Sequence, residues 1–357
     1  MKNWLPDIWL TLCYFLAGIL SLVVLSSISP EHVPQQAIAF VLGLLIYLYL
    51  SHQDAAVYKT FAPVGYFFAL LLLLATFVLG ASVRGAVRWI PLGSFQLQAG
   101  EFAKPFLILA FAYAIDRFPP RSLKNIGINL ALFAVPVFLI FRQPDLGTAL
   151  VVSAIWLTQI FVSGLPFWFI GTGGLLALIF GESLPHFLHD YQLKRLETFL
   201  DPFRDPLGAG YNVIQSIIAV GSGGVFGKGL GHGTQSHLSF LPERHTDFIF
   251  ASLAEELGLV GVCMVLAIIG TILYRLLHLA THSHDPVART IYVGTFSYLA
   301  FQTFINVGMN IGIAPVTGVT LPLISYGGSS ILATALALGI ASSLTRAGNK
   351  ETLLEIR

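Results

Sequence analysis

WLTLCYFLAGILSLVVLSS, residues 9–27, is the stretch that decides the fold class, because it contains no charged residue. An apolar run of about 17 to 25 residues is long enough for a helix to cross the hydrocarbon core of a bilayer. No small-residue cleavage site follows the run at residues 10–26, so we interpret it as a retained anchor and not as a signal peptide. Similar runs recur along the chain and predict a polytopic membrane protein.

The composition supports this class. The 357-residue chain is 55% hydrophobic and 10% charged, and its mean hydropathy is +0.79. In lipid every backbone amide must be bonded within its own segment, so we predict an all-α fold in a single integral membrane domain, residues 1–357. The net charge of +1 gives no electrostatic support for a nucleic-acid partner. Cys13 and Cys263 lie in apolar runs and are interpreted as packing residues.

About ten transmembrane helices are expected, and the Lys and Arg residues of the short loops orient them. Most of these residues fall on one side if the N-terminus is inside, whereas Arg84, Arg88 and Arg142 fall in the opposite loops. This bias predicts a multi-pass protein of the cytoplasmic (inner) membrane with both termini in the cytoplasm. The expected spans are 9–27, 34–51, 61–81, 100–116, 126–141, 147–163, 167–181, 248–274, 290–312 and 328–345.

One connection is much longer than the others. Residues 182–247 form a large extracytoplasmic loop between the seventh and eighth spans. Its aromatic and aliphatic content argues against disorder. Within it, YQLKRLETFL (191–200) has apolar residues at 193, 196, 199 and 200 with charges between them. This spacing predicts an amphipathic helix lying in the membrane interface.

GSGGVFGKGL (221–230), in the same loop, matches a phosphate-binding P-loop only partly. Ser222 stands where the first glycine is required, and Gly229 follows Lys228 where Ser or Thr is required. Two interpretations remain open. Either the backbone amides and Lys228 hold a diphosphate, or the glycines form a flexible or close-packed turn.

Charged residues inside apolar spans indicate a polar interior, because ionised groups are costly in a bilayer and are usually paired. In EFAK (101–104), Glu101 and Lys104 share one helix face and can pair. The pair either locks two helices together or contacts a substrate. Asp145 precedes Gly147 and Thr148 at a helix start, where a cap or an ion-pair partner is expected.

Two loops contribute to the same polar region. In the outer loop 84–98, Arg88 and Trp89 either grip a lipid phosphate or form part of an interfacial belt. APVTGVTLPLISYGGSS (314–330) contains prolines, glycines and hydroxyls between two apolar spans. Such backbone is tolerated at membrane depth only when it is buried or lines a cavity, so we predict a re-entrant loop that forms a wall of the site.

LPERHTDFIF (241–250) places a charged cluster directly before an apolar span. Thr246 is expected to be the N-cap of that helix, which would put Asp247 in its first turn. A carboxylate there stays ionised and can accept a proton as a general base. Alternatively, Asp247 only complements the helix dipole. Arg244, nearby, can pair with an acid or a phosphate.

Several motifs together resemble the SEDS (shape, elongation, division, sporulation) family. The resemblance covers nearly the whole chain, and RQPDLGT and PERHTDF are more similar to its RodA-like than to its FtsW-like members. QAGEFAK departs from the usual family sequence QPSEFAK. The motifs are RW (88–89), EFAK (101–104), QPDLGTA (143–149), TFLDPFRDPLGAGYNVIQS (198–216), GSGGVFGKG (221–229), GTQS (233–236), LPERHTDFIFASLAEELG (241–258), NVGM (306–309) and TGVTLPLISYGGSS (317–330).

The resemblance implies ten transmembrane helices and an inverting peptidoglycan glycosyltransferase that polymerises lipid II outside the cytoplasmic membrane during cell elongation. Lipid II is the undecaprenyl-diphosphate-linked disaccharide pentapeptide. The resemblance also implies that Asp247 is the essential aspartate, which takes the proton of the attacking sugar hydroxyl. The leaving diphosphate then needs positive charge from Arg88, Lys104, Lys228 or Arg244, or from a divalent cation such as Mg²⁺ or Mn²⁺.

The site expected from these motifs has a substrate-binding part and a structural part. No protein-held metal site is expected, since His282 and His284 are interpreted as solvated surface. The expected structural residues of the cavity are Asp145, Glu243, Thr246 and Asn306. The expected substrate-binding residues are Arg88, Trp89, Glu101, Lys104, Lys228, Gln235, Ser236, Arg244, His245 and Ser325.

The implied partners are lipid II, membrane lipid, a class B penicillin-binding transpeptidase, and the rod-complex proteins MreC and MreD. Two other functions are compatible with such a chain. A lipid II flippase would need polar groups through the full depth of the membrane, whereas the charges here gather toward one face. A scaffold for cell-wall enzymes would leave the polar cluster unexplained.

Overall fold

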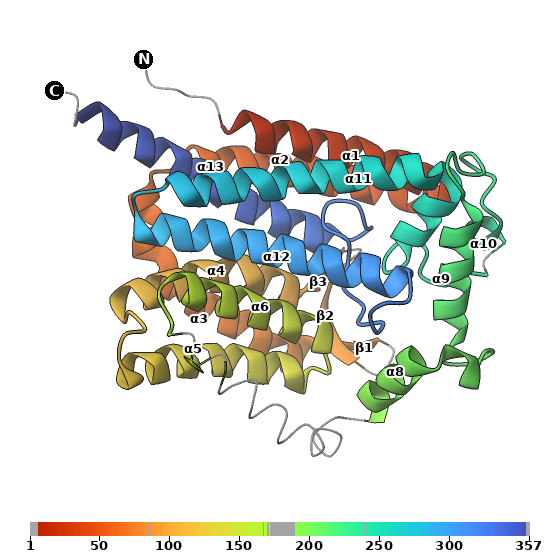
Figure 1. Ribbon diagram of the computed structural model, residues 1–357, viewed down its shortest axis with the longest axis horizontal. Helices are drawn as coiled ribbons and strands as arrows, with labels where there is room; N and C mark the ends of the chain where they lie inside the picture. Colours follow the sequence, from red (N-terminus) through yellow and green to blue (C-terminus); the bar gives the residue numbers. More distant parts are fainter. Residues whose placement is uncertain are drawn as a thin grey trace.

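The computed structural model describes residues 6–354 except 84–85, 94, 167, 170, 172–189 and 239. Its long helices form a bundle, and the start of α1 lies at the same end as the end of α13 (Figure 1). The helices are α1 (Ile8–Ile28), α2 (Val33–Ser51), α3 (Ala55–Leu79), α4 (Ala99–Arg117), α5 (Leu123–Arg142), α6 (Leu146–Val162), α11 (Ile249–His282), α12 (Pro286–Asn310) and α13 (Gly328–Leu354).

These helices confirm the predicted class. Every predicted span except the seventh coincides with one of them, and the largest difference in length is at α13, which continues to Leu354. The seventh, 167–181, lies mostly outside the described residues. Among the described helices, α1, α2, α3, α5, α11 and α13 are each apolar and long enough to cross a membrane. α4 and α12 carry polar side chains that are buried between helices, which explains their lower apolar content.

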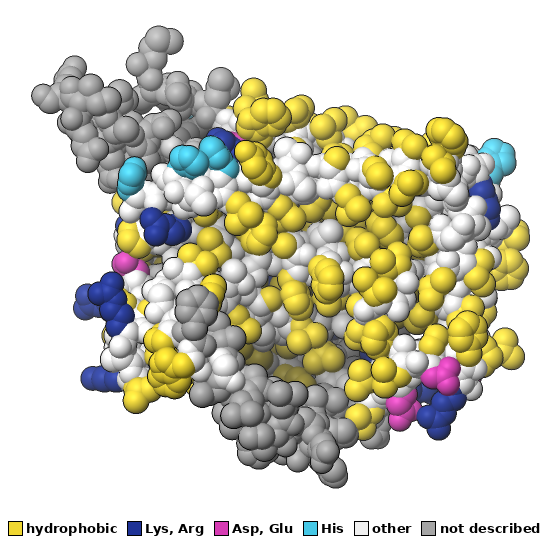
Figure 2. Space-filling view, in the orientation of Figure 1, with side chains coloured by type: hydrophobic (Ala, Val, Ile, Leu, Met, Phe, Trp, Pro, Cys, Tyr) yellow, Lys and Arg dark blue, Asp and Glu magenta, His cyan; other side chains and the backbone are white. Residues whose placement is uncertain are grey.

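The surface of the bundle suits a lipid environment. Hydrophobic side chains cover its middle, and charged and His side chains gather toward its two ends (Figure 2). Phe67, Val78 and Phe138 are examples of large apolar side chains that are mostly exposed. A continuous apolar surface of this kind is unfavourable in water and favourable against acyl chains.

The segment between α3 and α4 forms a small sheet that the sequence did not predict. β1 (Ala81–Val83), β2 (Ala86–Leu92) and β3 (Phe95–Gln98) pair antiparallel in the order β1-β2-β3. Trp89 is opposite Gln98, and Gly93 at the β2–β3 turn has a φ of +66°, which glycine adopts without steric cost. The paired backbone keeps this non-helical segment satisfied beside the membrane and fixes the position of Arg88.

The described part of the large loop contains short helices at one end of the bundle: α8 (Asp190–Leu200), the 3₁₀ turn η3 (Pro202–Arg204), α9 (Tyr211–Ser222) and α10 (Thr234–His237) (Figure 1). The helix predicted at 191–200 is confirmed as α8. α9 packs on α11, and the Ser216 hydroxyl donates to the Asn310 carbonyl oxygen over 2.9 Å. The α9 part of the loop is therefore docked on the bundle.

Residues 311–327 connect α12 to α13 as irregular, largely buried backbone. The Ser325 hydroxyl donates to the Thr246 carbonyl oxygen over 2.7 Å and accepts the Leu321 N–H over 2.8 Å. Asn306 on α12 donates to the Val319 carbonyl oxygen over 2.8 Å. These bonds satisfy backbone groups that lipid could not satisfy, as a re-entrant loop requires.

Candidate functional site

A polar cavity of about 560 Å³ opens at the end of the bundle that carries the sheet. Five segments form it: the turn between α1 and α2 with the start of α2, the sheet strands β2 and β3, the turn before α11, the re-entrant loop, and the start of α13. Its lining residues are His32, Gln35, Ile38, Arg88, Trp89, Gln96, Gln98, Glu243, His245, Thr246, Asp247, Gly318, Thr320, Tyr326, Gly327, Gly328, Ser329 and Ser330. Arg88, Trp89, Glu243, His245, Thr246 and Asp247 are thus brought together, as the sequence motifs indicated.

Asp247 lies in a turn before α11 and not in its first helical turn, so the predicted N-cap at Thr246 is wrong. The N-cap position is Phe248, and the Thr246 hydroxyl donates to Glu243 Oε2 over 2.9 Å. The N–H groups of Thr246 and Phe248 both donate to the Glu243 carbonyl oxygen, which closes the turn. The Thr246 hydroxyl is therefore bonded inside this turn and does not cap the helix.

The backbone of Asp247 is held by α12. Asn306 and Asn310 donate their side-chain N–H groups to the Asp247 carbonyl oxygen over 3.1 Å and 3.0 Å. Asn306 is fully buried and binds the re-entrant loop as well. Asn306 therefore has the structural position expected for it, and Asn310 is an additional residue that the motifs did not single out.

Arg88 and Asp145 form an ion pair at the edge of the cavity. Arg88 NH1 lies 3.5 Å from Asp145 Oδ1. Asp145 is also the N-cap of α6, since Thr148 donates its N–H to Oδ1 over 3.1 Å and its hydroxyl to Oδ2 over 3.0 Å. Both expected roles of Asp145, cap and ion-pair partner, are confirmed. Arg88 Nε is buried and has no hydrogen-bond partner among the described residues, so Arg88 retains a donor for an anion.

Asp247 and Arg88 approach the same point of the re-entrant loop, Gly318. A Cβ atom at Gly318 would lie 3.5 Å from Asp247 Oδ2 and 3.8 Å from Arg88 NH2. The φ of Gly318 is +75°, a conformation that side-chain-bearing residues rarely adopt. The loop therefore passes close to a carboxylate and a guanidinium that face one cavity.

Three aromatic rings line the same cavity. His245 stacks on His32 with ring centroids 4.5 Å apart, and Tyr326 meets His32 edge-on, also at 4.5 Å. Burial, with the neighbouring His32, lowers the pKa of His245 below its ordinary value of 6.5. Burial also raises the pKa of Tyr326. His32 and Tyr326 were not predicted as site residues, because nothing in their local sequence relates them to His245.

Glu101 and Lys104 are paired but are not among the described residues that line the cavity. Lys104 Nζ lies 2.7 Å from Glu101 Oε1, and the two side chains are 1% and 5% exposed. Lys104 Nζ also lies 4.8 Å from the centre of the Tyr298 ring. The predicted pair is confirmed as a buried ion pair on α4, whereas substrate contact by either residue is not supported, because the bundle encloses both.

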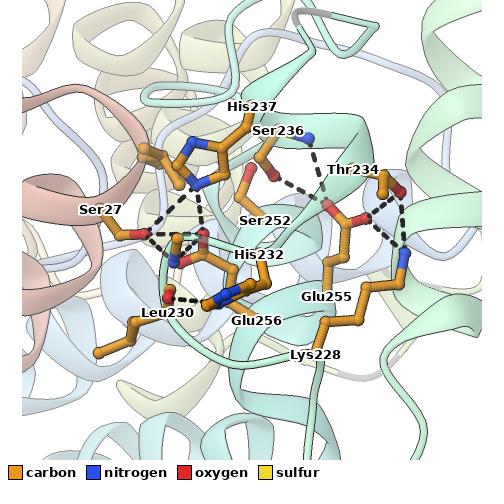
Figure 3. Close-up of polar contacts among 12 residues, drawn as sticks. Ser27, Lys228, Leu230, His232, Thr234, Ser236, His237, Ser252, Glu255 and Glu256 are labelled. Carbon is orange, nitrogen blue, oxygen red and sulfur yellow. Dashed lines mark hydrogen bonds and ion pairs between the residues drawn. The ribbon is translucent and has the colours of Figure 1, made fainter.

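Lys228 and Ser236 also lie away from the cavity, in a cluster around Glu255 of α11 (Figure 3). The backbone of Gln235 joins the same cluster. Lys228 Nζ is 2.8 Å from Glu255 Oε1, and the N–H groups of Gln235 and Ser236 donate to the Glu255 carboxylate over 3.0 Å and 3.2 Å. None of the three is among the described residues that line the cavity, and the side chains of Lys228 and Ser236 are already bonded to Glu255.

The glycine-rich stretch forms a close-packed turn against a kink in α11. Gly258 has φ 64° and ψ −161° within α11, and the N–H groups of Lys228 and Gly229 donate to the carbonyl oxygens of Glu255 and Glu256. A Cβ atom at Gly227 would lie 2.1 Å from the Glu256 carbonyl oxygen. Of the two interpretations, the close-packed turn is confirmed.

Glu256, next to Glu255, ties the same loop to α1. Its Oε1 accepts hydrogen bonds from the Ser27 hydroxyl over 2.7 Å and from the Gly231 N–H over 3.2 Å, and it lies 2.8 Å from His237 Nε2 (Figure 3). Sequence reasoning missed both glutamates. The available signal was two adjacent acids inside an apolar span, which normally indicates buried polar partners.

Arg244 and Ser325 have structural contacts. Arg244 Nε donates to the Ile28 carbonyl oxygen at the end of α1 over 3.0 Å. Ser325 is buried and bridges the re-entrant loop to Thr246. Neither is among the described residues that line the cavity. Of the basic residues expected to bind a diphosphate, only Arg88 lines it.

The helices, the re-entrant loop and the single-ended polar cavity define a multi-pass α-helical membrane protein with a site for a polar group at the membrane surface. The chain belongs to the SEDS family: residues 7–350 match the FtsW/RodA/SpoVE family, described as "Cell cycle protein". It is 46% identical over 305 residues to the peptidoglycan glycosyltransferase MrdB of Escherichia coli K12, covering 85% of this chain and 82% of that protein. It is 36% identical over 353 residues to a probable peptidoglycan glycosyltransferase FtsW of Aliivibrio salmonicida, covering 93% of this chain and 86% of that protein.

Solved structures show the same fold. RodA of Thermus thermophilus is 33% identical and superposes with a TM-score of 0.73, covering 96% of this chain and 98% of that one. A chain of a peptidoglycan synthase complex, studied for how it coordinates polymerization and crosslinking, is 37% identical with a TM-score of 0.82 and the same coverage of 96% and 98%.

Proposed function

We propose that this protein is a peptidoglycan glycosyltransferase that polymerises lipid II at the outer face of the cytoplasmic membrane during cell elongation, with Asp247 as the general base. The observation that carries the proposal is the joint position of the Asp247 carboxylate and the Arg88 guanidinium beside Gly318 in one polar cavity. Family membership and the identity to MrdB support the reaction class.

The transfer needs one base and one cationic group. A sugar hydroxyl of the acceptor attacks the anomeric carbon of the donor, the new glycosidic C–O bond forms, and the bond from that carbon to the diphosphate oxygen breaks. The hydroxyl proton goes to the Asp247 carboxylate, and the lipid diphosphate leaves with the bonding electrons. A glycosidase uses two carboxylates, but a diphosphate is already a good leaving group, so one suffices.

Arg88 is the residue suited to stabilise the departing diphosphate. It lines the cavity, and its buried Nε is a donor without a partner among the described residues. A guanidinium fits phosphate oxygens through two parallel N–H groups. Asp145 forms an ion pair with Arg88. Asn306 and Asn310 donate hydrogen bonds to the Asp247 carbonyl oxygen. Both charged groups are therefore positioned before substrate binds.

A divalent cation fits this site only as a companion of the diphosphate. Among the described residues, no group of three or more His, Cys, Asp or Glu side chains could hold a metal ion. Mg²⁺ is commonly held by one or two carboxylates together with substrate phosphates, and Glu243 and Asp247 line the same cavity. Mg²⁺ or Mn²⁺ bound there would supply positive charge to the leaving group.

We also propose the cellular arrangement. Both termini face the cytoplasm, which places the cavity and the large loop outside, where lipid-linked saccharides are joined. A class B penicillin-binding transpeptidase is the proposed partner, with MreC and MreD in the surrounding complex. The fold shared with a chain of a peptidoglycan synthase complex supports a partner of this kind.

The test is polymerisation of labelled lipid II by the protein in proteoliposomes, alone and with its transpeptidase. Wild type is expected to make glycan polymer. Asp247→Asn, which keeps the size of the side chain and removes its basicity, is expected to lose polymer while keeping the thermal midpoint of unfolding. Equal polymer from both would reject Asp247 as the base, and lipid II movement across the bilayer without polymer would indicate a flippase.

A further inference from the structure

The glycine-rich turn (residues 223–230) of the large loop exposes large apolar side chains. Phe226 is 84% exposed and Val225 is 55% exposed. The turn is joined to α11 just after the kink of that helix, where the side chains of Leu259 and Val260 are also exposed. An exposed apolar patch of this kind marks a surface that interacts with lipid or with another protein.

Backbone hydrogen bonds set the height of this turn along α11. The Leu259 N–H donates to the Gly224 carbonyl oxygen over 2.9 Å, and the Val260 N–H donates to the Val225 carbonyl oxygen over 3.1 Å. These N–H groups belong to the helix that begins after the kink and lack partners within that helix. Val225 and Phe226 are therefore held at the level of Leu259.

The ion pair at the other end of α11 shows where this level lies in the membrane. Arg275 Nη2 lies 2.8 Å from Oδ2 of Asp7, the N-cap of α1, and this charged pair marks one edge of the hydrocarbon. Leu259 precedes Arg275 by about 24 Å of helix at about 1.5 Å per residue. Since the hydrocarbon core is about 30 Å thick, the turn lies about 6 Å inside its opposite edge. A tilt of α11 would only move the turn further from that edge.

α1 gives an independent measure of the same level. It has 21 residues, and a helix of that length is about 30 Å long, which matches the hydrocarbon core. The end of α1 lies beside the start of α11 and the large loop (Figure 1). Ser27, near the end of α1, accepts the Gly231 N–H over 2.8 Å. The chain therefore leaves the turn at the edge of the hydrocarbon, and Val225 lies below that edge.

The turn also meets two requirements for backbone within hydrocarbon. The N–H groups of Gly227, Lys228 and Gly229 donate to carbonyl oxygens of the protein over 2.8 to 3.0 Å, and lipid could not satisfy these donors. Lys228 is the one charged residue in the sequence 223–230, and its Nζ lies 2.8 Å from Oε1 of the buried Glu255. Such pairing lowers the cost of an ionised group at this depth.

We propose that the glycine-rich turn is inserted into the bilayer and anchors the large loop there, with Val225 and Phe226 among the acyl chains of the adjacent leaflet. Lipid is the occupant because the level of the turn is that of acyl chains and because its exposed side chains continue the apolar face of α11. The anchor stabilises the docked position of the loop on Glu255 and Glu256. This inference rests on the membrane class of the protein and is independent of the reaction.

The first experiment measures depth with a nitroxide label on a single cysteine of the full chain in lipid nanodiscs. The test variant is Phe226→Cys in a background with Cys13→Ala and Cys263→Ala. The lipid reference is a label on the natural Cys263, which is exposed on α11 one turn beyond Leu259. The water reference is Arg121→Cys, at an exposed position in the connection between α4 and α5. Collisions of each label with oxygen, which concentrates in hydrocarbon, and with a water-soluble nickel chelate are compared.

The label at position 226 is expected to lose collisions with the nickel chelate and to gain collisions with oxygen, as the label on Cys263 does. The label at position 121 is expected to show the reverse. If position 226 behaves like position 121, the turn is in water and the proposal is overturned. A label at 226 that meets neither reagent would show that protein covers the turn, which also overturns the proposal. Val225→Cys takes the place of Phe226→Cys if the latter lowers the thermal midpoint.

A second experiment tests whether insertion holds the loop in place. Phe226→Ser removes the apolar group, and Phe226→Leu is the matched control that keeps one. Amide hydrogen exchange of residues 224–231 in nanodiscs is expected to be about tenfold faster in Phe226→Ser, because the turn opens more often when the side chain gains little from insertion. Phe226→Leu is expected to exchange at nearly the wild-type rate. Equal exchange in the two variants would show that Phe226 does not anchor the loop.

Discussion

Glu255 and Glu256 are adjacent and both fully buried, yet replacement of each by glutamine is expected to have different effects. Glu255 uses both carboxylate oxygens: Oε1 accepts from Lys228, Thr234 and the Gln235 N–H, and Oε2 accepts from the N–H and hydroxyl of Ser236. Glu256 uses only Oε1, because its Oε2 has no hydrogen-bond partner among the described residues.

The free energies follow from this difference. Glutamine at either position keeps one oxygen and loses the charge, and a bond to a charged group is worth about 1 kcal/mol more than one to a neutral group. At Glu255 the new NH₂ also faces the buried N–H of Ser236, and an unsatisfied buried donor costs about 1 to 3 kcal/mol. Glu255→Gln is therefore expected to lower the free energy of unfolding by about 3 kcal/mol. In Glu256→Gln the new NH₂ group can replace Oε2, which has no partner among the described residues, so the free energy of unfolding is expected to fall by only about 1 kcal/mol.

The assay is thermal unfolding of both variants in detergent, with amide hydrogen exchange of residues 223–240. Glu255→Gln is expected to give the lower thermal midpoint and faster exchange at Gln235 and Ser236, which donate to the lost oxygen. Glu256→Gln should leave that exchange near wild type. If Glu256→Gln is as destabilising as Glu255→Gln or more so, it is incorrect that Glu255 forms hydrogen bonds through both carboxylate oxygens and Glu256 through only one.

Three other perturbations test the cavity. Gly318→Ala should cost about 1 to 2 kcal/mol of stability, because the φ of Gly318 is +75°. It should also reduce polymerisation, because the new methyl group would lie 3.5 Å from Asp247 Oδ2. The thermal midpoint and the turnover measure the two effects. The thermal midpoint should fall as the pH drops below 6.5, because the pKa of His245 is lowered in the folded protein and the unfolded chain binds the proton first. His245→Phe keeps the ring beside His32 and should flatten this dependence. Chelation of divalent cations should lower turnover but leave the thermal midpoint unchanged, since a cation bound to substrate phosphates does not support the fold; a lowered midpoint would contradict this.

The sequence determined the membrane class, the helix positions and the local pairs. These features depend on short-range spacing, such as the length of residues 9–27 relative to a bilayer, or the separation of Glu101 and Lys104 by one helical turn. The amphipathic pattern at 191–200 likewise predicted α8, because helical periodicity relates nearby residues directly.

Only the tertiary structure decided which polar residues meet in and around the cavity. Arg88 and Asp145, or Ser325 and Thr246, are far apart in the sequence, and their contacts depend on how the sheet, the turn before α11 and the re-entrant loop pack together. Sequence reasoning therefore grouped Lys228 with the substrate residues, whereas packing places it on Glu255. The physical reason is that spacing along a helix or a bilayer is a local property, but neutralising a buried charge requires a partner that the whole fold brings within reach.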